Sequence, residues 1–337
     1  MAEINLFIIF IGSIAFDLII GDPSFLIHPV QVIGFYIEHI TNFFIHNFKG
    51  NNRLLFWGGL FIALSSIGIS FFIGKLIEVI FLGSKGNLVF GVLLFFGFSS
   101  CLASKSLTSS VKEISCQINN KHIDQRTETL IREKVQRIVS RDVTNSSIDH
   151  LLRSSSESLT ENSVDGIFGP LFWIFIGIVS MKFSILLPGP LSLGFSYKAV
   201  STLDSMIGYK YDQYKYLGFF SAKIEDYSTF IPCRLVLLTL PLVSSKINKY
   251  IPIIRKSYSD GSKYDSPNSG ISEAIFAYTA NIKLGGQSKY NNEIIDKPII
   301  NFNGDICSKE KINLICQLIL RLQMLWIIVF IIIFFNI

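Results

Sequence analysis

A row of charged side chains leads directly into a long apolar segment near the middle of the chain. The row recurs at every fourth position: Arg153, Glu157, Glu161 and Asp165. On a helix these positions stack along one slowly drifting face, and residues 166–187 beyond them are apolar except for Lys182. Carboxylates at such a place are costly unless cations match them. A solvated helix end at a membrane surface is the commoner explanation, but Asn162, two glycines and a proline crowd the same turn. The pattern therefore favours a binding or catalytic site.

The composition is typical of a membrane protein. Of the 337 residues, 50% are hydrophobic and only 16% are charged, whereas about 25% are charged in an average soluble domain. We interpret the formal net charge of +5 as an excess of Lys and Arg in cytoplasmic loops. No nucleic-acid partner is therefore expected. The five cysteines have neither paired nor metal-ligand spacing, which indicates no disulfide framework and no zinc site.

Four apolar runs are predicted to cross the membrane as helices. They are residues 6–20, 54–73, 88–103 and 314–337. Asp17 in the first run is either a functional carboxylate or a helix-end residue near the interface, and the sequence supports both interpretations equally. Residues 166–200 are predicted to bend at Pro188-Gly189-Pro190 into a hairpin that brings its polar ends together, and the short run 231–243 to be buried or re-entrant.

Two polar blocks, residues 104–163 and 244–313, hold nine and ten Lys or Arg residues. The opposite side offers only Lys85 as an obvious loop cation, so the positive-inside rule puts both blocks in the cytoplasm. We therefore predict an all-α polytopic membrane protein in a single domain over residues 1–337. It should have about four spanning helices plus re-entrant or buried hairpins and cytoplasmic helical segments.

Three short motifs could carry polar chemistry. GDPSFLIHPVQVIG at residues 21–34 has two proline turns, where Asp22 and His28 could bind metal or phosphate or move a proton. Each alone is more often a helix cap or a structural residue. SPNSG at residues 266–270 predicts a turn. LGGQSKY at residues 284–290 could direct backbone N–H groups at a phosphate, although Gly-Gly pairs are usually only turns.

Six motifs in fixed order resemble the CobD/CbiB family of cobalamin biosynthesis, the adenosylcobinamide-phosphate synthases of the bacterial inner membrane. They are GDP with HPV, RDVT, ESLTEN with the following DG and P, YKAVSTLDSMIGY, AKIEDYSTFIPCR, and SPNSG followed by LGG. The resemblance covers roughly residues 17–290. Each motif is modest, but the ordered set is specific.

The resemblance implies an ATP-dependent ligase that joins adenosylcobyric acid to aminopropanol phosphate or ethanolamine phosphate. The implied cofactors are ATP and Mg²⁺, and the implied partners are the corrinoid, the amino-alcohol phosphate, membrane lipid and other membrane enzymes of the corrinoid pathway. The implied location is the cell (inner) membrane, multi-pass, with the active site facing the cytoplasm. A phosphate-binding GxxxxGK[ST] loop is absent from the sequence, so a P-loop nucleotide site is excluded.

The implied site draws on most of these motifs. The residues implied to be catalytic are Glu157, Glu161, Asn162, Asp165, Lys198, Asp204, Asp22 and His28. Those implied to bind substrate or phosphate are Arg141, Asp142, Arg153, Tyr209, Lys223, Asp226, Arg234, Ser266 and Asn268. The metal ligands are expected among Glu161, Asp165 and Asp204, because carboxylate oxygens suit Mg²⁺.

The sequence departs from the family pattern at a few positions. Lys223, Glu225, Thr229 and Cys233 stand where Arg, Asp, Asn and Ala are expected, and Tyr264-Asp265 replaces His-Pro. Lys in place of Arg keeps the charge but loses bidentate phosphate geometry. These changes leave open an altered substrate.

Two other classes of function fit part of the pattern. Intramembrane charges and broken apolar segments also occur in secondary transporters, and a catalytically silent relative could act as a membrane sensor. A transporter should have little polar bulk outside the bilayer. The two polar blocks on one predicted side therefore favour an enzyme.

Overall fold

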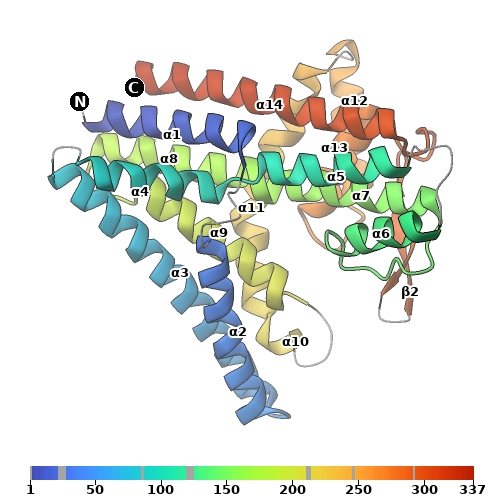
Figure 1. Ribbon diagram of the computed structural model, residues 1–337, viewed down its shortest axis with the longest axis horizontal. Helices are drawn as coiled ribbons and strands as arrows, with labels where there is room; N and C mark the ends of the chain where they lie inside the picture. Colours follow the sequence, from blue (N-terminus) through green and yellow to red (C-terminus); the bar gives the residue numbers. More distant parts are fainter. Residues whose placement is uncertain are drawn as a thin grey trace. The chain divides into compact units, whose positions relative to one another are not determined.

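A computed structural model describes residues 2–21, 28–84, 87–118, 125–209, 214–244, 247–290 and 293–337. These residues are mostly helical, with one two-stranded sheet, as Figure 1 shows. The predicted helical fold class is confirmed. The chain divides into two compact units, each built from two stretches: Met1–Lys105 with Asp165–Thr229 (unit 1), and Ser106–Val164 with Phe230–Ile337 (unit 2).

The first half of the chain forms helices joined by short turns. Its elements are α1 (Ala2–Ile19), α2 (Pro29–Phe48), α3 (Asn52–Gly83), α4 (Leu88–Cys101), α5 (Ser104–Ile118), α6 (Gln125–Gln136), α7 (Ile148–Ser163), the π-helical turn η1 (Val164–Phe168) and α8 (Gly169–Phe183). The second half adds α9 (Pro190–Ile207), α10 (Tyr214–Leu217), α11 (Phe219–Thr239), the 3₁₀ turns η2 (Leu240–Val243) and η3 (Ile247–Lys249), α12 (Tyr250–Gly261), α13 (Ser269–Ala280), β1 (Leu284–Tyr290), β2 (Glu293–Ile300) and α14 (Lys309–Asn336).

Five helical stretches of the described chain are long and apolar enough to cross a membrane. They are Asn52–Gly83, Leu88–Ile118, Ile148–Phe183, Phe219–Val243 and Lys309–Asn336. Three contain predicted spans. The other two contain segments that the sequence predicted to be re-entrant or buried. These helices are longer than predicted because each begins in polar sequence ahead of its apolar run. The first apolar run forms a shorter helix, Ile4–Ile19. These lengths are those of a multi-pass membrane protein.

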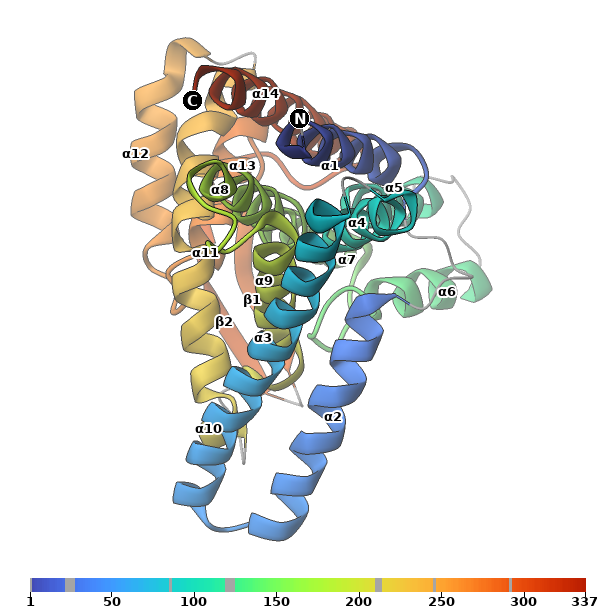
Figure 2. The ribbon, with the colours of Figure 1, turned by 90° about the vertical axis from the view of Figure 1, so that its left-hand side faces the viewer.

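Unit 1 is a helical bundle. In it α3 packs on α9, α1 on α4, and α8 on α9. Helices α2 and α3 form a helical hairpin, seen side by side in Figure 2. Apolar side chains from α2, α3, α9 and α10 form one buried core there: Ile37, Leu55, Ile62, Ala63, Leu203, Ile207 and Leu217. The amphipathic spacing along α9 thus buries its apolar side while leaving polar positions half-buried.

The hairpin predicted at Pro188-Gly189-Pro190 is present. α8 ends at Phe183, a turn follows, and Pro190 stands at the first position of α9, where the fixed backbone angle of proline suits the start of a helix. Glu78 of α3 accepts hydrogen bonds from the backbone N–H groups of Leu191 and, at 2.9 Å, Ser192. The N-terminus of α9 is therefore capped by a carboxylate from another helix.

The other carboxylate inside an apolar run of unit 1 has a similar role. Asp17 Oδ2 accepts a hydrogen bond from the N–H of Ser104 at 3.0 Å, at the start of α5. The N-terminus of a helix carries partial positive charge and unsatisfied donors. A carboxylate from a neighbouring helix satisfies those donors where water cannot reach them. Asp17 and Glu78 thus stabilise the fold of unit 1.

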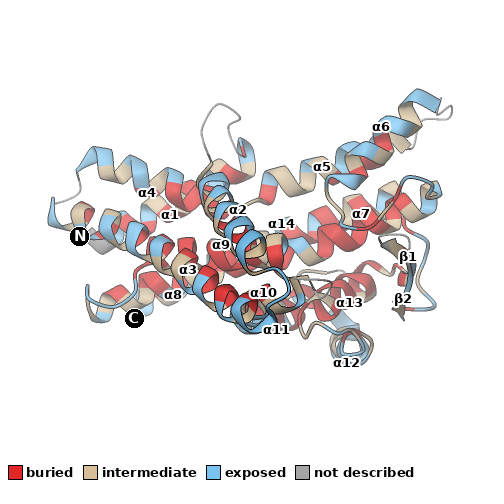
Figure 3. Cartoon of the chain, turned by 90° about the horizontal axis from the view of Figure 1, so that it is seen from below, coloured by how far each residue is buried: buried red, intermediate tan, exposed pale blue. Residues whose placement is uncertain are grey.

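Unit 2 surrounds one buried helix. Figure 3 shows α7 buried along most of its length. In this unit α12 packs on α13, and α13, α14, α6 and β1 all contact α7. The strands pair antiparallel with a bulge between Leu284 and Gly286. The tightly packed α7 is rich in serine, whose small side chains let neighbouring backbones come close.

We expect Gly177→Ala to destabilise unit 1. A methyl group at Gly177 would lie 2.5 Å from backbone atoms of Gly189 and Pro190, so the hairpin must open, at a cost of about 1–3 kcal/mol. Gly68→Ala is the matched control, because a methyl group added there would meet nothing within 4 Å and alanine favours a helix by up to about 1 kcal/mol. Thermal unfolding midpoints in detergent should fall for Gly177→Ala only. Equal midpoints would mean that the α8–α9 contact is looser than the structure has it.

Candidate active site

A buried ion pair lies at the centre of unit 2. Glu157 of α7 has a side chain only 1% exposed, and its Oε2 lies 2.6 Å from Nη1 of Arg141, which is 6% exposed. Arg153, one helical turn before Glu157, has its Nε 3.7 Å from Oε1. Taking such charges out of water costs several kcal/mol each unless partners satisfy them. Two guanidinium groups therefore share one carboxylate in a nearly dry environment.

The bulge of β1 completes this cluster. Gly285 and Gly286 have φ of +80° and +87°, values that other residues rarely adopt. The bulge aims the N–H of Gly285 at Oε1 of Glu157, to which it donates at 2.8 Å. A side chain at Gly285 would also collide with the carbonyl of Pro298. The Gly-Gly pair is therefore part of a bulged strand, and the N–H of Gly285 is occupied by Glu157.

The arginines also bind the strand that follows the bulge. Arg141 Nη1 donates to Ser288 Oγ at 3.0 Å, and Arg153 Nη2 donates to the carbonyl of Gln287 at 2.6 Å. Beside them, Asp142 forms an ion pair with Lys289 at 3.1 Å. Hydrogen bonds from Thr144, with Lys289, lower the pKa of Asp142 to about 2. The RDVT segment is thus attached to β1 by both of its charged residues.

A second carboxyl group, Glu273 of α13, is fully buried near this cluster. Its Oε1 has no hydrogen-bond partner in the described part of the chain, and its Oε2 accepts only a long bond of 3.5 Å from Tyr264. Burial raises the pKa of Glu273 well above its ordinary value, and the negative charges of Glu157 and Glu161 add to the shift. Glu273 therefore keeps its proton at pH values where an exposed glutamate is ionised.

Other predicted residues of unit 2 form a second group. Arg234 donates to Oδ1 of Asn268 at 2.5 Å and to the carbonyl of Pro267 at 2.8 Å. Its guanidinium also stacks on the ring of Phe230, 3.7 Å from the centroid. Ser266 Oγ accepts from the N–H of Asn268. Arginine therefore fastens the SPNSG turn to α11.

The remaining predicted residues of α7 lie at its end. Glu161 is half-buried, one turn beyond Glu157, while Asn162 is exposed and donates to the carbonyl of Ser158 at 2.9 Å. Asp165 follows in the π-helical turn, a feature that is frequent at functional sites. Asp165 already belongs to unit 1. The predicted row of charges is thus divided between the units.

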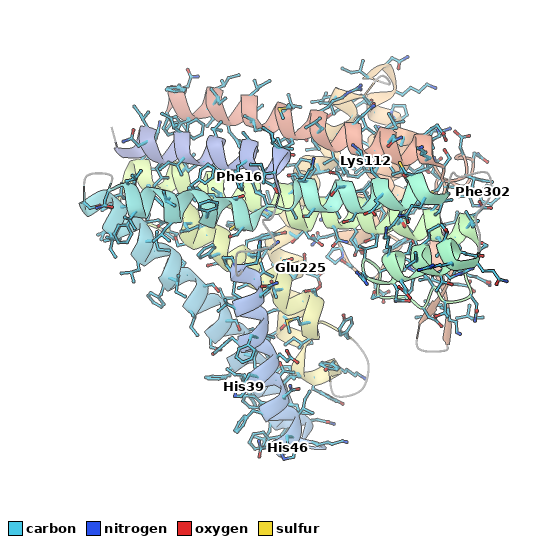
Figure 4. The ribbon with its side chains drawn as sticks, in the orientation of Figure 1. Phe16, His39, His46, Lys112, Glu225 and Phe302 are labelled. Atoms are coloured by element: carbon cyan, nitrogen blue, oxygen red, sulfur yellow. The ribbon has the colours of Figure 1, made fainter. Side chains whose placement is uncertain are left out.

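Several predicted residues belong to unit 1. Lys198 and Asp204 are half-buried on α9, and Tyr209 after it donates to the carbonyl of Ser205 at 2.8 Å. Lys223 and Asp226 form an exposed pair on α11, 3.4 Å apart. Glu225, between them, is labelled in Figure 4. No catalytic role of these residues is tested by the structure, and each stays a prediction.

The two predicted residues of the N-terminal turn have different outcomes. His28 Nδ1 accepts from the N–H of Val30 at 3.3 Å and caps α2. This is the structural role that the sequence left open beside a catalytic one. Asp22 lies outside the described residues, so its role stays a prediction.

The predicted metal ligands do not form a preformed cage within the described residues. No three His, Cys, Asp or Glu side chains there could jointly hold a metal ion. Mg²⁺ usually keeps several waters and takes only one or two carboxylates beside substrate phosphates. The roles of Glu161, Asp165 and Asp204 as metal ligands stay predictions.

Sequence reasoning missed Glu273, Ser288 and the part played by Gly285. The signal for Glu273 was available, since it is the single charge in ISEAIFAYTA, and a lone carboxylate in an apolar helix indicates a buried partner or function. Ser288 had no local signal. Its contact with Arg141 joins residues 147 positions apart.

Removing one member of the central ion pair should destabilise unit 2 strongly. Glu157→Ala leaves Arg141 buried without its counter-charge, at a cost of about 3–5 kcal/mol. Glu113→Ala is the matched control, because its pair with Lys134 is largely exposed and is worth less than about 1 kcal/mol. Chemical unfolding followed by circular dichroism should separate the two variants. Similar losses would show that the Arg141–Glu157 pair is already hydrated.

The neutral Glu273 predicts a pH-dependent stability difference. Its folded pKa is raised, so its contribution is fully present below the unfolded pKa and is lost as pH rises toward the folded pKa. Glu273→Gln has no such titration. The stability of the variant should therefore rise relative to that of the wild type as pH increases above the ordinary glutamate pKa, by at most about 1.4 kcal/mol per pH unit. Thermal midpoints measured across this range check it, and a pH-independent difference would contradict a neutral Glu273.

Comparison with known proteins identifies the family. The chain matches the family model described as CobD/Cbib protein over residues 10–319. It is 38% identical over 290 residues to the cobalamin biosynthesis protein CobD of Synechocystis sp., covering 86% of this chain and 80% of that protein. It is 32% identical to the cobalamin biosynthesis protein CobD of Clostridium tetani, with 95% of each chain covered. No solved structure matches. The chain belongs to the CobD/CbiB family of cobalamin biosynthesis proteins.

Proposed function

We propose that the protein forms an amide bond between the propionate carboxyl of adenosylcobyric acid and the amine of aminopropanol phosphate or ethanolamine phosphate, using ATP. The product is adenosylcobinamide phosphate. One observation carries the proposal: three motifs of the family resemblance meet at one buried ion pair. Glu157 of ESLTEN contacts both Arg141 of RDVT and Gly285 of LGG, although Glu157 and Gly285 are 128 residues apart.

The proposed reaction has two balanced steps. A carboxylate oxygen of the corrinoid attacks the γ-phosphorus of ATP, the bond to the bridging oxygen breaks, and ADP leaves. The amine of the second substrate then attacks the acyl carbon, phosphate leaves, and the ammonium formed gives up a proton. Catalysis of this kind needs cations on phosphate oxygens, an acceptor for the proton, and exclusion of water.

The arginines of the cluster differ in how close a phosphate could come. Arg153 is 24% exposed and Arg141 only 6%, so Arg153 is the better candidate to touch a phosphate oxygen. Its Nε is buried without a hydrogen bond in the described part of unit 2. Glu157 holds both guanidinium groups. We therefore assign Glu157 and Arg141 to positioning, and Arg153 to phosphate binding.

Magnesium would neutralise charge on the phosphates of ATP. Glu161 fits this need best among the residues of unit 2, because it is half-buried, lies one turn from Glu157 and has a carboxylate oxygen. We also propose Asp165 and Asp204, which belong to unit 1, as magnesium ligands. The proton released by the ammonium would pass to solvent water, because Glu273 is fully buried and already protonated.

The proposed location is the inner membrane, with the site open to the cytoplasm. The support is the number of Lys and Arg residues in the blocks 104–163 and 244–313, since cytoplasmic loops carry such an excess. Both blocks supply the buried cluster, which contains Arg141 and Gly285. Soluble ATP and the amino-alcohol phosphate would reach the site from that side.

We expect membranes containing the protein to form the amide product from adenosylcobyric acid, ATP, Mg²⁺ and aminopropanol phosphate. Glu161→Gln should lower kcat by about a hundredfold or more, the usual effect of losing one group that stabilises transition-state charge. Glu133→Gln, an exposed position on α6, is the matched control and should stay active. Chromatography of the corrinoid products measures both.

Two outcomes would count against a ligase. Product formation that does not require ATP would exclude the proposed activation of the carboxylate. ATP-independent uptake of a corrinoid into sealed vesicles, without amide product, would favour a carrier. Equal activity of Glu161→Gln and the wild type would remove Glu161 from the site while leaving the reaction itself in place.

A further inference from the structure

A cavity of about 250 Å³ lies in unit 2, apart from the buried ion pair. One wall is a face of α14 with Lys311, Leu314, Leu318 and Arg321, which recur at intervals of three, four and three residues. The facing wall includes Thr279 at the end of α13 and Ser244 after η2. The cavity is therefore lined by cations, hydroxyl groups and leucines.

Arg321 is the cation that most needs a ligand. It is exposed on a helix that is apolar and long enough to cross a membrane. An arginine in such a helix is costly unless it pairs or reaches a polar group. Within the described residues no hydrogen bond or ion pair to its guanidinium occurs. Its five N–H donors in a planar fork match the oxygens of a phosphate group.

Thr279 gives independent evidence of a missing partner. It is only 3% exposed, and its Oγ1 has no hydrogen-bond partner in the part of the chain that the structure describes. A buried hydroxyl without a partner costs about 1–3 kcal/mol. A threonine there is explained if a ligand in the cavity accepts its hydrogen bond.

The second cation is already partly neutralised. Lys311 Nζ lies 2.7 Å from Oδ2 of Asp305 and donates to the carbonyl of Ala280 at 3.1 Å. The two cations are ten residues apart, about 15 Å along the helix. The net charge of these three side chains is thus +1, concentrated at Arg321, and a single anionic group suits it.

Apolar side chains near the cavity indicate the rest of the ligand. Leu242 of η2 and Leu320 and Met324 of α14 are exposed, as expected of surfaces that face acyl chains. Leu314 and Leu318 line the cavity itself. Anionic phosphate next to apolar surface is the chemistry of a lipid headgroup.

We propose that this cavity binds the phosphate group of an anionic membrane lipid, with Arg321 as the main cation and Thr279 as a hydrogen-bond donor. A free phosphate carries the same chemistry, so the two sources must be separated by experiment. The site is independent of the ligase reaction, because none of its residues belongs to the Arg141–Glu157 cluster.

The test uses the full-length protein in nanodiscs of phosphatidylcholine with or without phosphatidylglycerol. Native mass spectrometry counts retained phosphatidylglycerol, and thermal midpoints report binding. We expect Arg321→Gln to weaken phosphatidylglycerol binding about tenfold, equivalent to one lost charge-assisted hydrogen bond, and Thr279→Val to weaken it less. Lys309→Gln is the matched control, because Lys309 is a cation of α14 that does not line the cavity.

A parallel arm adds inorganic phosphate to discs of phosphatidylcholine alone. If inorganic phosphate stabilises the wild type but not Arg321→Gln, the phosphate site is supported and its ligand comes from solution. A preference for phosphatidylglycerol that Arg321→Gln removes would support the lipid source. If Arg321→Gln behaves as the wild type in both arms, or if Lys309→Gln loses as much, the proposal is overturned. Because both readouts are binding, a ligase assay that fails leaves this result unaffected.

Discussion

The ion pair between Arg141 and Glu157 is the interaction on which the architecture of unit 2 depends. Two nearly dry charges 2.6 Å apart are tolerable when hydrogen bonds from neighbouring groups add to their mutual attraction. That condition explains the bulge of β1, which turns the N–H of Gly285 toward the carboxylate. Glu157 itself lies on α7, which is buried along most of its length. The pair thus fixes where a helix, a loop and a strand must meet.

The serines of α7 make that burial possible. Ser155 and Ser156 donate to the carbonyls of Leu151 and Leu152, four residues earlier, at 2.8 and 2.9 Å. Their hydroxyls are therefore satisfied without partners from other helices. Small side chains that satisfy their own hydrogen bonds allow α13 and β1 to approach closely. A helix with a polar sequence can consequently be the centre of a core.

Much of the fold was predictable because its signals are local. Pro190 begins α9 because proline suits the first position of a helix whatever surrounds it, and apolar length predicted most of the long helices. The candidate site was predictable in part. Arg141, Arg153 and Glu157 were named from residue type and motif, but their meeting with β1 was not, since it joins segments more than a hundred residues apart through a bulge. His28 had two local interpretations: the hydrogen bond to Val30 shows the helix cap, and a catalytic role stays a prediction.

The arginines of unit 2 differ in whether the protein itself supplies their hydrogen-bond partners. Arg141 is buried with a carboxylate and two hydroxyl groups around it, so partners within the protein already satisfy its charge. Arg234 is likewise held by Asn268 and Pro267. Arg321 has no such partner within the described residues and faces a cavity with a buried, unpaired hydroxyl. A guanidinium that the protein itself satisfies contributes to the fold, whereas one without a protein partner beside a cavity has its donors available to an anionic ligand.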